Sequence, residues 1–239
     1  MRTWVNVARY HLTQPLIFVG LVWAIMAFSF AVNMVIFRLV PTGQAFAGSQ
    51  GAIASPHYTG AVSIIYVFFF IMGVFATGRS LPFGLALGVS RRSYYTGTAL
   101  LAVVLAAADA VVLTALQAIE RATNGWGEEL HFFRVPYLLD GPWYLTWLTS
   151  FVGLALLFAY GMWFGIVYRR WSIPGNVAFI AAQVTALLAA ALLISWLNGW
   201  TAVGRFFTAL SAAGLTGLLA ALTVALLAGG YATVRRVTV

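Results

Sequence analysis

The chain has 239 residues, of which 62% are hydrophobic and 8% are charged, with a mean hydropathy of +0.94. No soluble core of this size needs so much apolar sequence, so the composition indicates an integral membrane protein and excludes a soluble one. The formal net charge of +8 comes from thirteen basic residues, all of them arginine. They lie in short gaps between apolar runs, which predicts topological anchors rather than a nucleic-acid partner.

Six segments are long and apolar enough to cross a bilayer, for which roughly 20 residues are needed. They cover residues 16–37, 61–78, 97–118, 145–167, 177–197 and 208–231. The expected fold is therefore all-α, a single transmembrane domain over residues 1–239 with six helices. No internal repeat and no soluble stretch of domain size is present in the sequence.

The arginines predict the orientation of these helices. With both termini in the cytoplasm, nine arginines and no acidic residue lie inside, and four arginines lie outside with four acidic residues. The inner set is Arg2, Arg9, Arg79, Arg91, Arg92, Arg169, Arg170, Arg235 and Arg236. The outer charged set is Arg38, Arg121, Arg134, Arg205, Glu120, Glu128, Glu129 and Asp140. This N-in, C-in arrangement satisfies the positive-inside rule and makes residues 119–143 an extracellular loop.

Small residues recur at four-residue spacing on three of the predicted spans. These are Gly161 and Gly165 on the fourth, Ala102, Ala106 and Ala110 on the third, and Gly217, Ala221, Ala225 and Gly229 on the sixth. Such stripes permit close backbone approach between membrane helices. They are compatible with a seam between two subunits or with ordinary packing inside one bundle.

Asp109 lies near the middle of the third predicted span, where a charged carboxylate costs about 2.5–3.5 kcal/mol on insertion scales. It must therefore be protonated, paired or hydrated. One interpretation makes it part of a translocation path together with Asn33 and Gln183. The other is an interhelical hydrogen bond to Asn33, Gln183 or Thr185.

The sequence offers no catalytic or metal site. The three histidines are scattered, zero cysteines exclude disulfides, thiolate catalysis and thiolate metal ligation, and no intramembrane-protease motif is present. Glu128 and Glu129 are interpreted as part of a solvated loop. A chain without lysine cannot contain the phosphate-binding GxxxxGK[ST] loop, so we expect no enzyme activity and no cofactor in this chain.

The most distinctive polar segment reads RSLPFGLALGVSRRSYYTGT, residues 79–98. Pro82 can open a short helix, Ser90 can cap the helix that follows, and the residues between form an apolar knob flanked by arginines. A plain interfacial turn anchored by the arginines is the alternative. LPFGLALGVSRRSYYTGT resembles the loop between the second and third spans in membrane subunits of bacterial type-2 ATP-binding-cassette (ABC) exporters, and the six-span layout and length also agree.

This resemblance implies a multi-pass protein of the bacterial plasma membrane that forms the path for a hydrophobic or amphipathic cargo. Residues 1–15 would form an amphipathic elbow helix, and residues 79–95 a cytoplasmic coupling loop that docks on a separate ATPase subunit binding ATP and Mg. The implied coupling residues are Pro82, Phe83, Leu85, Leu87, Arg91 and Arg92, and a charge at Leu85 should abolish coupled transport. The implied partners are the ATPase, a second permease copy or paralogue, and membrane lipid.

One segment departs from the family pattern. Many relatives have a pair of short re-entrant helices between the fifth and sixth spans, whereas here only NGWTAVGRFFTALS, residues 198–211, is available. Two other functions stay open. A secondary transporter could be driven by protons through Asp109, or the chain could be a membrane assembly or immunity subunit that transports nothing.

Overall fold

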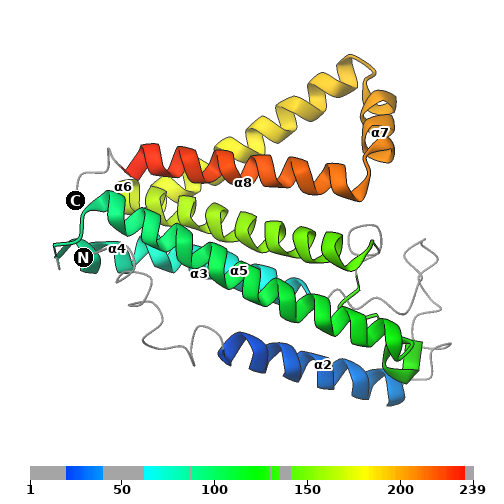
Figure 1. The fold of residues 1–239 in the computed structure, drawn as a ribbon. Helices are drawn as coiled ribbons and strands as arrows, with labels where there is room; N and C mark the ends of the chain where they lie inside the picture. Colours follow the sequence, from blue (N-terminus) through cyan, green and yellow to red (C-terminus); the bar gives the residue numbers. More distant parts are fainter. Residues whose placement is uncertain (1–19, 40–61, 87, 130, 135–140, 235–239) are drawn as a thin grey trace.

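The computed structural model describes residues 20–39, 62–86, 88–129, 131–134 and 141–234 (Figure 1). Within these ranges the regular structure is helical and contains no strand. Four of the helical segments are long and apolar enough to cross a membrane. The prediction of an all-α protein with helices long and apolar enough to span a membrane is therefore confirmed, while the proposed elbow at 1–15 lies outside the described residues.

The helices follow the predicted apolar segments closely. Their bounds are Leu21–Leu39 (α2), Ser63–Gly78 (α3), Ser80–Ala86 (α4), Arg91–Ala122 (α5), Trp143–Trp196 (α6), Trp200–Ala209 (α7) and Ala212–Val234 (α8), with a π-helical turn η2 at Gly125–Glu129. The helix predicted at 97–118 is the centre of the longer α5. The four residues added at its carboxyl end, 119–122, place Glu120 and Arg121 in a helix, where the sequence predicted the start of a loop.

The fourth and fifth predicted spans, 145–167 and 177–197, are two arms of α6. Ser172 breaks the helix with φ 55° and ψ −151°, a backbone conformation that costs a residue with a side chain about 1–3 kcal/mol. Pro174 follows in the first turn of the second arm, where its missing N–H is tolerated. A sharp bend at the predicted cytoplasmic turn results.

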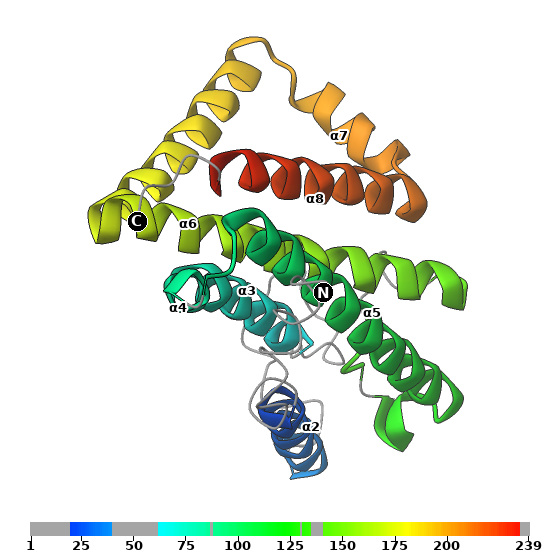
Figure 2. The same cartoon turned by 60° about the vertical axis from the view of Figure 1, so that its left-hand side comes forward.

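Successive helices run in opposite directions between two ends of the molecule (Figures 1 and 2). α2, α5 and the second arm of α6 run one way, and α3, the first arm of α6 and α8 run the other. One end holds α4, the start of α5, the bend of α6 and the end of α8. The opposite end holds η2, the start of α6 and α7.

The centre of the fold is a close approach of α3 and the first arm of α6. A Cβ at Gly161 would overlap the carbonyl oxygen of Phe70, and one at Gly73 would overlap that of Phe158. Gly165 lies equally close to Thr77. The Gly161/Gly165 motif therefore packs inside the chain, so this stripe is not a seam between subunits.

The other two small-residue stripes differ from each other. Ala102, Ala106 and Ala110 are buried on α5. On α8, Gly217, Ala221 and Ala225 are exposed, whereas Gly229 is partly buried and an added Cβ there would lie 3.0 Å from Trp163. At Gly217 an added Cβ would meet nothing within 4 Å. Only the α8 stripe stays available for a second subunit.

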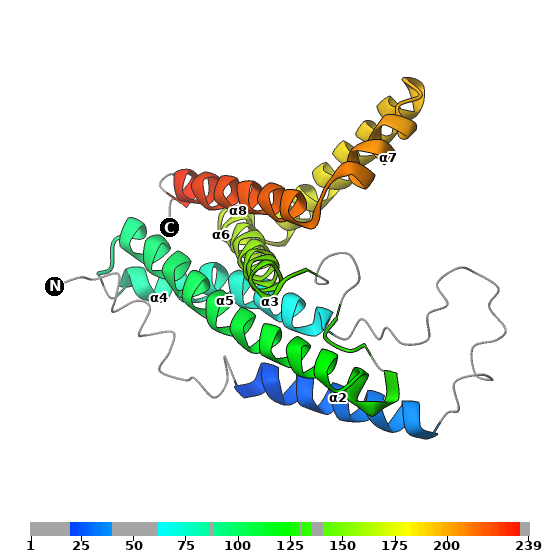
Figure 3. The same ribbon diagram turned by 45° about the vertical axis from the view of Figure 1, so that its right-hand side comes forward.

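The second arm of α6 is held near the bend and then separates from the other helices (Figure 3). Tyr160 donates to Gln183 Oε1 over 2.5 Å, and Phe179 stacks on Trp163. Further along, Leu187 and Leu192 are each 71% exposed. The connection 198–211 is not a plain loop, because most of it forms α7, a short helix without a buried residue.

Candidate functional site

The joint, residues 79–95, links α3 to α5 through α4 and a tight turn. Gly88 has φ +79°, which favours glycine, and Val89 N–H donates to the carbonyl of Gly84 at 3.1 Å. Ser90 ends the turn in an extended conformation and its hydroxyl accepts from Ser93 N–H at 3.2 Å. The predicted cap at Ser90 is confirmed, and the predicted short helix begins at Ser80, two residues before Pro82.

The inner face of α4 is fixed on α5 through Tyr94. Leu81 and Tyr94 are both buried, and a Cβ at Gly84 would lie 2.6 Å from the Tyr94 ring. The Tyr94 hydroxyl donates to the carbonyl of Ala76 on α3 at 2.7 Å. One side chain therefore connects α4, α5 and the end of α3.

The outer face of α4 presents apolar surface at the arginine-rich end of the molecule. Phe83 is 50% exposed, Pro82 and Leu85 are partly buried, Arg91 is partly buried and Arg92 is exposed. The predicted coupling residues thus lie on one short segment, apart from Leu87, which is outside the described residues. Leu85 packs against the Leu81–Tyr94 pair, so Phe83 is the most exposed apolar side chain among the predicted coupling residues that the structure describes.

The neighbouring tyrosine connects the joint to α8. Tyr95 donates to the carbonyl of Leu227 at 2.8 Å and its ring lies 6.0 Å from that of Tyr231. Thr77, buried on α3, donates to the carbonyl of Met162 on α6 at 2.9 Å. Displacement of the joint would therefore act on three long helices at once.

Asp109 is half-buried between α5 and α2, where its Oδ1 accepts a hydrogen bond from Trp23 Nε1 at 2.9 Å. An interhelical hydrogen bond was one of the two predicted roles, but the donor is Trp23 rather than Asn33, Gln183 or Thr185. Asn33 instead donates to Ser29 in its own helix. Gln183 pairs with Tyr160. These three candidate path residues therefore do not form one hydrogen-bonded cluster.

The Trp23–Asp109 bond predicts a measurable coupling between α2 and α5. In a double-mutant cycle of Trp23→Phe and Asp109→Ala, we expect a coupling energy of about 0.6–1.7 kcal/mol, the range found for hydrogen bonds between membrane helices. Unfolding of the four variants in detergent micelles would measure it. Asp109→Asn keeps an acceptor for Trp23 and should stay close to the wild type in stability. Strictly additive effects of the two single changes would contradict the bond.

Glu120 is a residue whose role the sequence analysis missed. It is 1% exposed, and its Oε2 accepts from the backbone N–H groups of Phe132 at 3.1 Å and Phe133 at 2.8 Å. Trp126 Nε1 also donates to Oε2, at 3.2 Å, and Arg134 N–H donates to Oε1 at 3.2 Å. We call Glu120 with these four donors the outer latch.

The outer latch also positions α2. Its three aromatic side chains surround Phe30 of α2, with ring centroids 4.9 Å away for Trp126, 5.2 Å for Phe132 and 6.1 Å for Phe133. A signal was present in the sequence, because Glu120 is followed within fourteen residues by three aromatic residues in a loop otherwise rich in polar residues. The sequence interpretation instead grouped Glu120 with the other outer charges, beside Glu128 and Glu129 of the solvated loop.

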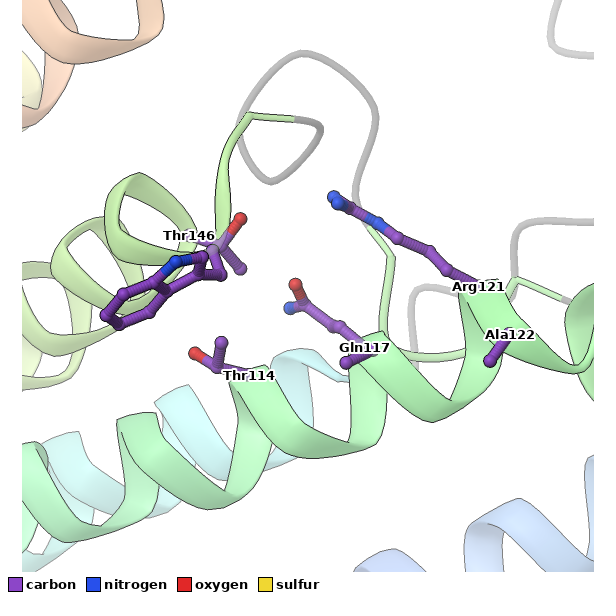
Figure 4. A pocket seen from close by; sticks show the side chains of 7 residues that line it. Thr114, Gln117, Arg121, Ala122 and Thr146 are labelled. Atoms are coloured by element: carbon purple, nitrogen blue, oxygen red, sulfur yellow. The ribbon is translucent and has the colours of Figure 1, made fainter.

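A cavity of about 390 Å³ opens between the end of α5 and the start of α6 (Figure 4). It is lined by Thr114, Gln117, Ala118, Arg121, Ala122, Trp143 and Thr146. Gln117 is 1% exposed and neither its Oε1 nor its Nε2 has a hydrogen-bond partner. Among the described residues, no three histidine, aspartate or glutamate side chains approach closely enough to hold a metal ion.

Comparison of the chain with protein-family models, with curated proteins and with solved structures found no match. The features of the chain that bear on its function are therefore the residues of the joint, the directions of the helices and the charges at the two ends.

Proposed function

We propose that this chain is the membrane-spanning subunit of an ATP-driven exporter, in which two such subunits form the path for a hydrophobic or amphipathic cargo and separate ATPase subunits supply the energy. The observation that carries the proposal is the joint. A short apolar helix at the arginine-rich end has one face locked to the long helices and its other face exposed.

The helix directions support six membrane passes with both termini in the cytoplasm. Because each arm of α6 is longer than 20 residues, each can cross a bilayer on its own. α2 adds a further apolar helix, so the alternating directions in Figure 1 amount to an even number of passes. The end that holds Arg79, Arg91, Arg92, Arg169 and Arg170 would face the cytoplasm of a bacterial cell.

The joint has the features required of a mechanical coupling element. Phe83 offers an apolar anchor of the kind that fills a pocket on a partner protein, and the arginines around it favour an acidic rim on that partner. Behind it, Tyr94 and Tyr95 bond directly to the backbones of α3 and α8. Movement of α4 by a partner would shift these helices as packed bodies rather than bending a flexible loop.

A second subunit is supported by the surfaces that one chain leaves uncovered. The stripe of Gly217, Ala221 and Ala225 on α8 is exposed, and small residues are typical of close contacts between membrane helices. The outer half of the second α6 arm also exposes Leu187, Leu188, Leu192 and Leu193. In the proposed assembly, lipid and the second copy cover these surfaces.

The test is to purify the tagged chain with its co-expressed ATPase from native membranes and to measure vanadate-sensitive ATP hydrolysis. Phe83→Asp should remove ATPase co-purification, reducing the yield of the complex at least tenfold, as expected when a buried aromatic anchor worth 2 kcal/mol or more is lost. Phe83 is preferred to Leu85, because a charge at Leu85 would also disturb the packing around Tyr94.

The matched control is Thr96→Asp, which places the same charge on an exposed position in the second turn of α5, directly after the joint. This variant should retain the ATPase. If the wild-type chain purifies alone and transports cargo in a manner abolished by a protonophore, the exporter proposal is wrong and a proton-driven transporter takes its place.

A further inference from the structure

The cavity beside Gln117 lies at the depth of lipid headgroups. α5 has 32 residues and is about 48 Å long at 1.5 Å per residue, so a hydrocarbon core of about 30 Å covers only its central 20 residues. With α5 centred in the bilayer, Gln117 falls just beyond that core on the outer side. The exposed Trp143 and Tyr144 at the start of α6 agree with this level, since aromatic belts mark the interface.

The cavity opens toward the surroundings of the helix pair rather than into the core. Ala118 and Ala122 are exposed on α5, and Trp143, which is 73% exposed, stands at the other side of the opening. In a bilayer this opening faces the outer leaflet. A lipid can therefore enter sideways without any movement of the helices.

The chemistry of the lining favours an anion that also has a hydroxyl group. Gln117 presents one unsatisfied acceptor and an unsatisfied NH₂ donor inside the cavity, and a buried amide without partners is unfavourable. Arg121 supplies the only charge in the lining, and Figure 4 shows its guanidinium on the same side as the Gln117 amide. The amino end of α6 adds partial positive charge next to Trp143.

We propose that this cavity binds the phosphate-bearing headgroup of an outer-leaflet phospholipid. Gln117 Nε2 and Arg121 donate to phosphate oxygens, and a headgroup hydroxyl donates to Gln117 Oε1. Phosphatidylglycerol has both groups. The volume of about 390 Å³ accommodates such a headgroup but not the acyl chains, which would extend along the apolar surface of α5. This binding does not depend on transport, but its assignment to the outer leaflet rests on the orientation given for the proposed function.

The test uses thermal unfolding of the purified full-length chain in a neutral detergent, with added phosphatidylglycerol, diacylglycerol, glycerol 1-phosphate or inorganic phosphate. Phosphatidylglycerol should raise the unfolding midpoint of the wild type, and Gln117→Leu should weaken that response about tenfold in lipid concentration, as for one lost charge-assisted hydrogen bond. Without lipid, Gln117→Leu should unfold at a higher temperature than the wild type, because the unpaired amide is gone.

Gln183→Leu is the matched control. It removes a second glutamine of the helical domain, but one that is hydrogen-bonded to Tyr160, so this variant should lose stability and keep the full response to phosphatidylglycerol. Arg121→Gln gives a second variant at the site, with a weaker response to the lipid and an unchanged fold.

Three results would overturn the assignment. Equal stabilisation by glycerol 1-phosphate or inorganic phosphate would make the ligand a soluble phosphate rather than a lipid. Equal stabilisation by diacylglycerol would show that the headgroup is not recognised. An unchanged response in Gln117→Leu would place the lipid elsewhere and leave this cavity to water.

Discussion

Replacing Gly161 by alanine is expected to destabilise the protein by about 3 kcal/mol, or to prevent its folding, although alanine is the better helix former. The added Cβ would overlap the Phe70 carbonyl oxygen and lie 3.0 Å from Val74 N. Both neighbours are backbone atoms of α3, so no side-chain rotation can relieve the overlap. α3 and α6 would have to separate along their whole contact.

Gly204→Ala is the control for this change. Gly204 also lies in a helix, α7, but an added Cβ there meets nothing within 4 Å. That variant should equal the wild type or gain up to about 1 kcal/mol. Thermal unfolding in detergent, followed by the loss of monodisperse protein, measures both variants. Equal midpoints for Gly161→Ala and Gly204→Ala would show that the α3–α6 seam is looser than in the structure.

In the proposed exporter, the seam would let the joint act at a distance. Gly73, Gly161 and Gly165 bring the two helices into backbone contact, and Thr77 closes the end of that contact nearest the joint through the Met162 carbonyl. Side chains with rotamer freedom would absorb a displacement, whereas contacting backbones pass it on. In the proposed exporter, the force applied at Phe83 therefore reaches α6 and α8 with little loss.

The apolar runs and helix-cap residues made the helices and the joint predictable from the sequence. Membrane helices are specified locally, by hydrophobic length and by residues such as Ser90, so α2, α3, α5 and α8 follow the predicted ranges closely. The continuation of α6 across residues 168–176 was not predictable in the same way. The predicted spans 145–167 and 177–197 leave a short cytoplasmic gap that holds Arg169 and Arg170, whereas in the structure the helix continues through this gap and breaks at Ser172.

The partners of the polar residues could not be predicted, because they depend on which helices become neighbours. Asp109 was singled out by its cost in the membrane, but nothing in the local sequence indicated Trp23, 86 residues away. Glu120 was treated as one outer charge among several. Its burial arises only when residues 132–134 fold back and direct three consecutive backbone N–H groups at the end of α5.

Glu120→Ala is expected to release the outer loop, the second of the two largest effects. It would leave the buried backbone N–H groups of Phe132 and Phe133, the partly buried N–H of Arg134 and the Trp126 indole without the Glu120 acceptor. Each buried donor without an acceptor costs about 1–3 kcal/mol. The open form of the loop, in which water satisfies these donors, therefore has a lower free energy than the closed form. Hydrogen exchange at residues 132–134 should accelerate at least a hundredfold, about 2.7 kcal/mol.

Glu120→Gln separates the geometry of the latch from its charge. The amide oxygen can keep the three donors that share Oε2, but the NH₂ group then faces the N–H of Arg134. Protection should fall to an intermediate level. Arg121→Gln removes the Arg121 bond to the Gly141 carbonyl but leaves all four bonds of the latch in place, so exchange at residues 132–134 should stay close to that of the wild type. Fast exchange at residues 132–134 in the wild type itself would contradict the latch.

The consequence of the latch extends to α2, which lies at the edge of the bundle. Its ties to α5 and the outer loop are the Trp23–Asp109 bond near mid-membrane and the packing of Phe30 on the latch aromatics. Once Glu120→Ala has released Trp126, Phe132 and Phe133 from their packing on Phe30, only the Trp23–Asp109 bond still holds α2 to α5. Trp23→Phe should therefore cost more in the Glu120→Ala background than alone, and α2 amides should exchange faster in the double variant than the two single effects predict.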